Sequence, residues 1–207
     1  MSLNDYKDKQ NNDIANADLE IKISGFFTQE LVIIEAKKYY VKLKDGINFN
    51  DLAYILTSTT VINNNDSKDI FLNGFSIKND SVVKKYLQQN CLILDENMFL
   101  NDNLTFAENI KIVSFLFSGY NLTEACLSSF GVKELGNKKV KDLTPEQKKI
   151  AILSYTICCP SIIWIIDNIL IKNLNNKLLD FFENAVKIRI KHGGVVLIVD
   201  SDLKNNY

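Results

Sequence analysis

Leu143-Thr-Pro-Glu-Gln147 and the later run Ile162-Ile-Trp-Ile-Ile-Asp167-Asn168 are the stretches that decide how this chain folds. The first is typical of a helix start, because a threonine followed three positions later by glutamine forms a capping box and proline is favoured at the first helical position. The second is a continuous apolar run, which is typical of a strand buried on both faces. Together they predict a capped helix and then a core strand that ends in an acidic residue and an amide.

The residues that follow complete a strand–helix–strand unit. A helix is predicted over 175–191, where it is closed by Gly193-Gly194, and a last strand over Val195–Val199. Continuously apolar strands joined by a helix favour a parallel sheet with helices on both faces.

The middle of the chain is helical. Thr105 and Glu108 form a capping box before an apolar-periodic helix that runs to about Phe117. A second helix is predicted over 122–130, stopped by Gly131, and a third begins at Thr144. These helices form an insert between two β-rich stretches.

The N-terminal half is rich in short strands. Asn73-Gly74 is the strongest short hairpin signal in the chain and predicts a β-hairpin over 70–77. Residues 1–17 are polar and predict a disordered tail. The remaining elements are predicted as strands over 18–26, 30–35, 39–43 and 91–94, with helices over 52–60 and 81–87.

The composition is that of a globular protein. Of the 207 residues, 46% are hydrophobic and 24% charged, and a net charge of −1 gives no reason to propose a nucleic-acid surface. Four cysteines without a C-x-x-C pair, and a single histidine, argue against a zinc site and favour reduced thiols in a reducing compartment. Residues 150–171 are mostly apolar, but Pro160 and Asp167 interrupt them, so a buried helix followed by a core strand explains them better than a membrane span.

From about residue 18 this order of elements resembles the ATP-binding subunits of ABC transporters, and the compact length is similar to the haem-exporter subunits of cytochrome c maturation. The resemblance implies an α/β fold of the P-loop NTPase (ABC ATPase) type, with a mostly parallel sheet, an N-terminal antiparallel part and a helical insert. It places the ATPase core at 18–104 and 156–207 and a helical subdomain at 105–155.

The family's phosphate-binding loop falls on residues 43–51, Leu-Lys-Asp-Gly-Ile-Asn-Phe-Asn-Asp. Such a loop binds phosphate through glycine-rich backbone N–H groups, a lysine and a hydroxyl that holds Mg²⁺. Only Gly46 remains here. Phe49 stands at the lysine position, and Asn50 and Asp51 replace the hydroxyls. Taken alone, the segment is an ordinary strand-to-helix turn.

The run from Cys91 to Asn109 resembles the family's Q-loop and the helix start that follows it, with Glu96 at the glutamine position. A polar loop before a capped helix is the alternative interpretation. Asp167 matches the Walker B aspartate, and Ser201 stands at the switch histidine. Asn168 occupies the position of the general-base glutamate, and an amide cannot accept a proton near neutral pH.

The signature turn of the family presents backbone N–H groups and a serine to a partner's nucleotide at a helix N-terminus. Thr144 can imitate that serine, and Gln147 is present. Pro145 has no N–H to offer, and Glu146 places negative charge where phosphate would sit. A plain capped helix start describes this turn better.

The resemblance therefore implies a degenerate ABC ATPase-like subunit, a pseudo-ATPase with no intact catalytic residue, no metal site and no expected cofactor. It implies a structural or assembly role in a membrane complex, peripheral to the membrane on its reducing side, in the bacterial cytoplasm or the mitochondrial matrix. ATP and Mg²⁺ are expected only under the alternative, a slow but functional ATP-binding subunit. An unrelated α/β binding module is the third interpretation.

The implied partners are an integral membrane permease, haem-exporter-like by resemblance, and a second ATPase-like subunit in a homo- or heterodimer; nucleic acid is not among them. The permease is expected to dock in a groove beside the Q-loop and the helical insert, over residues 96–100 and 106–117. The residues predicted to line this groove are Glu96, Met98, Phe99, Leu100 and Phe106.

Overall fold

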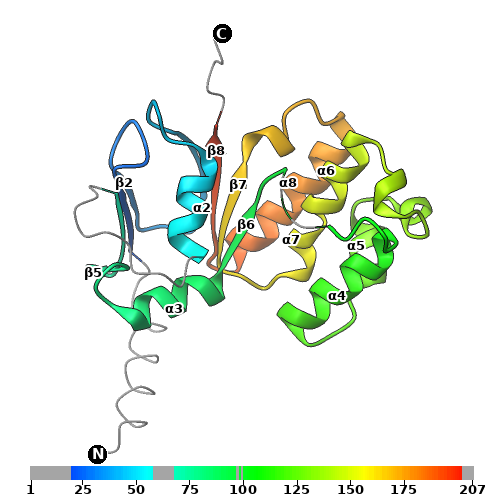
Figure 1. The fold of residues 1–207 in the computed structure, drawn as a ribbon, viewed down its shortest axis with the longest axis horizontal. Helices are drawn as coiled ribbons and strands as arrows, with labels where there is room; N and C mark the ends of the chain where they lie inside the picture. The colour runs from blue at the N-terminus through cyan, green and yellow to red at the C-terminus, as the bar shows by residue number, and fades with distance from the viewer. Residues whose placement is uncertain (1–19, 58–67, 97, 99, 202–207) are drawn as a thin grey trace, which may run out of the picture. The chain divides into compact units, whose positions relative to one another are not determined.

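A computed structural model of the chain describes residues 20–57, 68–96, 98 and 100–201 (Figure 1). The contacts divide the chain into two units, the first formed by 1–35 and 43–88 and the second by 36–42 and 89–207. The predicted tail, 1–17, lies outside the described residues.

The first unit contains an antiparallel sheet with the strand order β2-β1-β4-β5. Its hairpin turns at Asn73 and Gly74, whose φ angles of 49° and 82° are the left-handed values that a two-residue hairpin loop requires. The predicted hairpin is therefore present. The strands are β1 (Ile21–Ser24), β2 (Leu31–Ile33), β4 (Asp69–Leu72) and β5 (Phe75–Ser76).

Two helices accompany this sheet in the chain. Helix α2 (Phe49–Thr57) begins three residues before the predicted start, and residues 58–60 of the predicted helix lie outside the described part. Helix α3 (Ser81–Asn90) begins after Asp80, whose carboxylate accepts hydrogen bonds from the backbone N–H groups of Val82 and Val83. It leads into the second unit.

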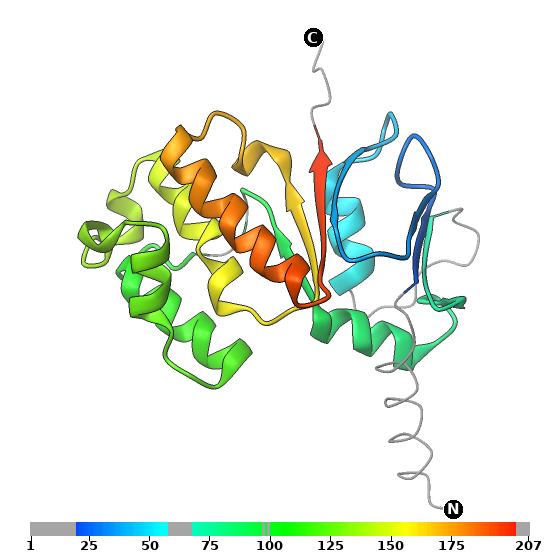
Figure 2. The same cartoon turned by 180° about the vertical axis from the view of Figure 1, so that it is seen from behind.

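The second unit contains a fully parallel sheet with the strand order β3-β8-β7-β6. Every residue of β7 is buried, as a continuous apolar run predicts. Helix α8 (Asn176–Lys191) lies across one face of this sheet (Figure 2). The strands are β3 (Lys38–Lys42), β6 (Cys91–Leu94), β7 (Ile163–Asp167) and β8 (Val195–Asp200). The two sheets confirm the predicted α/β class with an antiparallel N-terminal part.

Helices follow one another between β6 and β7. They are α4 (Phe106–Ser118), α5 (Thr123–Ser129), α6 (Pro145–Leu153) and α7 (Tyr155–Cys158), with the short 3-10 helices η1 (Lys133–Leu135) and η2 (Val140–Asp142). A third 3-10 helix, η3 (Asn168–Leu170), follows β7 directly. Helix α7 packs against both α4 and α5, and the buried residues of these helices share one core with β6, β7 and β8.

The predicted division into an ATPase core and a separate helical subdomain at 105–155 stays a prediction, and these helices fall in the same unit as the parallel sheet. The apolar stretch 150–171 folds as the end of α6, then α7, then β7, so no single helix covers it. Among the helices formed by described residues, none combines the length and apolar character needed to span a bilayer.

Candidate functional site

The segment at the phosphate-loop position, 43–51, forms a turn that closes on itself. Gly46 has a φ of 82°, and the Ile47 N–H donates to the Lys44 carbonyl at 3.0 Å. The Asp51 N–H donates to the Asn48 side-chain oxygen at 3.0 Å, and the Asn48 N–H donates to the Asp51 carboxylate at 3.0 Å. This reciprocal pair follows the pattern of a capping box, which also explains why α2 starts at Phe49.

The cap has a consequence for anion binding. A helix N-terminus attracts phosphate because its first N–H groups lack intrahelical partners and its dipole favours negative charge. At the N-terminus of α2, the chain supplies a negative group of its own, because the Asp51 carboxylate accepts a hydrogen bond from the Asn48 N–H. Phe49, at the position of the family's lysine, is 5% exposed and belongs to the hydrophobic core. Asn50 is exposed.

At the carboxyl end of the parallel sheet, Asp167 and Ser201 lie together. Asp167 ends β7 and is buried. Its Oδ1 accepts a hydrogen bond from the Ser201 hydroxyl at 2.6 Å and another from the Ile169 N–H at 3.1 Å, which caps η3. The structure therefore joins the positions that resemble the Walker B aspartate and the switch residue, and the same oxygen of Asp167 serves both protein donors.

Burial raises the pKa of Asp167, because a carboxylate loses water when it leaves the solvent. The hydrogen bonds from Ser201 and Ile169 lower this pKa, and the negative charges of Asp95 and Glu96 raise it. In the described part of the chain, no group of three or more histidine, cysteine, aspartate or glutamate side chains is arranged to hold a metal ion.

The substitution Asp167→Asn tests this environment. A carboxyl whose folded pKa is raised contributes stability that is complete below its unfolded pKa and is lost as pH rises through the folded pKa. Asparagine keeps the accepting oxygen and removes the buried charge. We therefore expect the variant to melt above the wild type at pH 7, with a difference that shrinks as pH falls toward the unfolded value of about 3.9.

Thermal unfolding measured between pH 4 and 8, a range set by the unfolded pKa of about 3.9, checks this expectation. Asp180→Asn, at an exposed carboxyl on α8, controls for the loss of one negative charge. A wild type that is more stable than Asp167→Asn at neutral pH would mean that the carboxylate makes favourable contacts beyond those with Ser201 and Ile169.

Two further predicted positions lie at the same edge of the sheet. Asn168 begins η3 and is half-buried, where it lines a cavity of about 220 Å³ with Tyr40, Lys42 and Asp200 among its neighbours. Glu96 follows β6 and forms an ion pair with Lys149 at 3.1 Å. No sequence pattern pointed to Lys149, which is distant from Glu96 along the chain.

The signature-equivalent positions cap α6. The Gln147 N–H donates to the Thr144 hydroxyl oxygen at 3.3 Å, and the Thr144 N–H donates to the Gln147 side-chain oxygen at 3.0 Å. Pro145 occupies the first helical position, and Glu146 is exposed in the first turn. The helix N-terminus at this position is therefore also capped by the chain's own side chains.

The predicted docking groove differs in detail from what the structure contains. Phe106 is fully buried, because it lies on the face of α4 that enters the core, so it cannot line a surface groove. Met98 and Leu100 are half-buried and pack against the same core. Phe99 lies outside the described residues.

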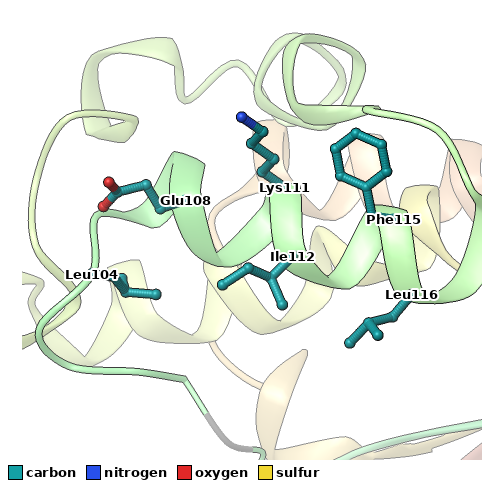
Figure 3. Close-up of a pocket in the computed structure, with 6 residues that line it drawn as sticks. All are labelled: Leu104, Glu108, Lys111, Ile112, Phe115 and Leu116. Carbon is teal, nitrogen blue, oxygen red and sulfur yellow. The ribbon is translucent and has the colours of Figure 1, made fainter.

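A cavity of about 560 Å³ lies instead along the outer side of α4 (Figure 3). Ile112, Phe115 and Leu116 are 48%, 49% and 76% exposed. In Figure 3, Lys111 and Phe115 project from one side of the helix and Ile112 and Leu116 from the other. The cavity, called the α4 groove below, is lined by Leu104, Glu108, Lys111, Ile112, Phe115 and Leu116.

The chain is similar in sequence to proteins named cytochrome c biogenesis ATP-binding export protein CcmA. The relative from Rickettsia felis is 23% identical over 188 residues, covering 89% of this chain and 91% of the relative. The relative from Rickettsia bellii is 23% identical over 173 residues, with 84% and 83% covered. The relative from Reclinomonas americana is 24% identical over 138 residues, with 63% and 62% covered. No family model matches the chain.

Solved structures of ATP-binding subunits share the fold. One ATP-binding subunit of an ABC transporter superposes with a TM-score of 0.64 at 15% identity, covering 91% of this chain and 81% of that one. A dimeric ATP-binding cassette bound to ADP and Pi gives 0.64 at 14% identity, with 90% and 89% covered. At such identities the likeness establishes the fold. With the sequence matches, it identifies the chain as having the ABC ATPase fold and as resembling the ATP-binding subunit CcmA.

Proposed function

We propose that this chain is a degenerate ABC ATP-binding subunit, which acts as a structural or assembly partner of a membrane complex without hydrolysing ATP. The observation that carries the proposal is that the N-terminus of α2, at the phosphate-loop position, is capped by a carboxylate and lacks the family's lysine. There the Asp51 carboxylate bonds to the Asn48 N–H, and Phe49 is buried where the family has a lysine. A phosphate would meet a negative charge at this helix start, and a buried ring at the position where the family has its cation.

The second phosphate-binding position supports the same conclusion. In the family, one chain's signature helix faces nucleotide held by the other chain's phosphate loop. The α6 N-terminus of this chain is capped by Thr144 and Gln147 and carries Glu146 in its first turn. A dimer of this chain with any ATPase-like subunit would therefore have a weakened contact on each of its two composite sites.

The chemistry at Asp167 adds a third argument. A water molecule needs a general base before it can attack the γ-phosphate, and removal of such a base typically lowers the rate about 10²–10⁴-fold. Asn168 stands beside Asp167 at the position of that base, and the Asp167 oxygen that accepts from Ser201 also accepts from Ile169. Binding of ATP at this site would not lead to efficient hydrolysis.

The α4 groove supports the partner role. Its apolar side chains are exposed on one helix of the unit that contains the parallel sheet, and recognition of this kind commonly takes an amphipathic helix into an apolar groove. We propose that the occupant is a helix of an integral membrane permease, haem-exporter-like by the resemblance to CcmA. The chain would then lie at the membrane surface on the reducing side, in a bacterial cytoplasm or a mitochondrial matrix.

Thermal shift with Mg-ATP tests the proposal. A ligand at 100 times its dissociation constant stabilises the folded state by about 2.7 kcal/mol. We expect millimolar Mg-ATP to leave the melting temperature of the full chain unchanged and to yield no phosphate above the rate without protein.

The second candidate function is a slow but working ATP-binding subunit. It is favoured by the aspartate retained at the end of β7 and by the matches to proteins named as ATP-binding. A rise in melting temperature that follows the Mg-ATP concentration, together with phosphate release that scales with protein, would establish this candidate and reject the first.

A further inference from the structure

Lys149 joins three segments that are far apart in the sequence. It lies on α6, and its ammonium group is 3.1 Å from the Glu96 carboxylate, which follows β6. The same group donates a hydrogen bond to the Ile169 carbonyl in η3 at 2.8 Å. The Lys149 side chain is 22% exposed and the Glu96 side chain is 43% exposed.

The two contacts connect α6 to neighbouring strands of the sheet. Strands β6 and β7 are paired, with Leu94 opposite Ile166, so Glu96 and Ile169 follow the carboxyl ends of adjacent strands. An ammonium has three donors and no acceptor, and hydrogen bonds that involve a charged group are roughly twice as strong as neutral ones. Lys149 thus holds both strand ends from one side chain.

The neighbouring residue provides a contrast. Lys148 pairs with Asp102 at 3.6 Å, and both side chains are open to water, at 40% and 63% exposure. Exposed ion pairs of that kind contribute between zero and about 1 kcal/mol. Lys149 differs from Lys148 in its shorter ion-pair distance, its lower side-chain exposure and its additional contact with the Ile169 carbonyl, so we expect it to be the stronger of the two contacts of α6.

We propose that Lys149 is a brace, which fixes the helices between β6 and β7 against the carboxyl edge of the sheet. The brace keeps the α4 groove in one arrangement, since α6 packs on α7 and α7 packs on α4. It depends on a carboxylate at position 96. The inference rests on the proposed function only for the role of the groove, which is to bind a helix of the permease.

Hydrogen exchange measured by mass spectrometry on the full chain tests the brace. Lys149→Met removes the ammonium and keeps most of the apolar stem, so exchange in α6 and η3 is expected to accelerate about fivefold. Glu96→Gln removes only the charge of the partner and is expected to give a smaller increase in the same peptides. The double variant should exchange no faster than Lys149→Met, because both substitutions break the same contact.

Lys148→Met is the matched control and should change exchange less than twofold, as expected for an exposed pair. The brace is rejected if Lys149→Met leaves α6 and η3 at the wild-type rate, or if Lys148→Met has an equal effect. If Lys149→Met does not fold, Glu96→Gln still tests the brace. Unchanged exchange of α6 and η3 in Glu96→Gln also rejects it.

Wild-type exchange with and without Mg-ATP separates this inference from the proposed function. The proposed function expects no change on addition of Mg-ATP. Slower exchange with Mg-ATP and phosphate release that scales with protein, combined with an acceleration by Lys149→Met, would reject the pseudo-ATPase assignment and leave the brace standing. No response to Mg-ATP, combined with no effect of Lys149→Met, would reject the brace and leave the pseudo-ATPase assignment standing.

Discussion

Phe49→Lys is expected to destabilise the first unit by about 3–5 kcal/mol and to leave the chain without measurable affinity for Mg-ATP. The range is that for truncating a buried phenylalanine, and an unpaired buried charge adds a further cost. Phe49 is 5% exposed, and Leu52, three residues further along α2, is fully buried. The substitution restores the family's lysine at a position that belongs to the hydrophobic core of this chain.

Asn50→Lys is the matched control, because it introduces the same charge at the next, exposed residue. Its stability should stay within about 0.5 kcal/mol of the wild type. Exchange of the α2 amides is the suitable measurement, since the only tryptophan, Trp164, lies in the second unit and its fluorescence reports on that unit. A Phe49→Lys variant that remains folded and gains a thermal shift with Mg-ATP would show that the loop lacked nothing but its lysine.

The outcome of sequence-based prediction differs between local and distant features of this chain. The Asn73-Gly74 hairpin and the capping boxes that begin α4 and α6 were predictable, because each arises from hydrogen bonds between residues at most three positions apart. Strand β7 was predictable because a strand buried on both faces must be apolar at every position.

The early start of α2 illustrates a competing interpretation. Asn48 and Asp51 have the spacing and the chemistry of a helix cap, whereas the phosphate-loop pattern at the same positions predicts only a missing lysine and missing hydroxyls. The capping pattern alone would have placed the helix start at Phe49.

The groove and the brace could not be derived from sequence for physical reasons. Helix α4 carries apolar residues around most of its circumference, so periodicity does not decide whether Phe106 or Leu116 faces the core. The pairing of Lys149 with Glu96 depends on how α6 packs beside β6, and no local pattern encodes such a contact.

The second large effect concerns the α4 groove. Leu116→Asp is expected to lower the amount of permease recovered with the chain at least about thirtyfold, as for an interface residue worth 2 kcal/mol or more. Leu116 is 76% exposed, so the folded state loses little when its side chain becomes charged. Binding suffers much more, because an aspartate placed under a docked apolar helix would be buried without a partner.

Ile188→Asp on α8 is the matched control. Both residues are exposed aliphatic side chains in the last turn of their helices, so the unfavourable effect of a negative charge at a helix C-terminus is common to both. The measurement is affinity purification from detergent-solubilised membranes of the source cells, with the recovered multi-span proteins quantified against the wild type. Equal recovery with Leu116→Asp and wild type would contradict docking at α4, whereas equal losses with both variants would trace the effect to surface charge in general. Selective loss with Leu116→Asp alone, at an unchanged melting temperature, is the result that the exposed apolar face of α4 leads us to expect.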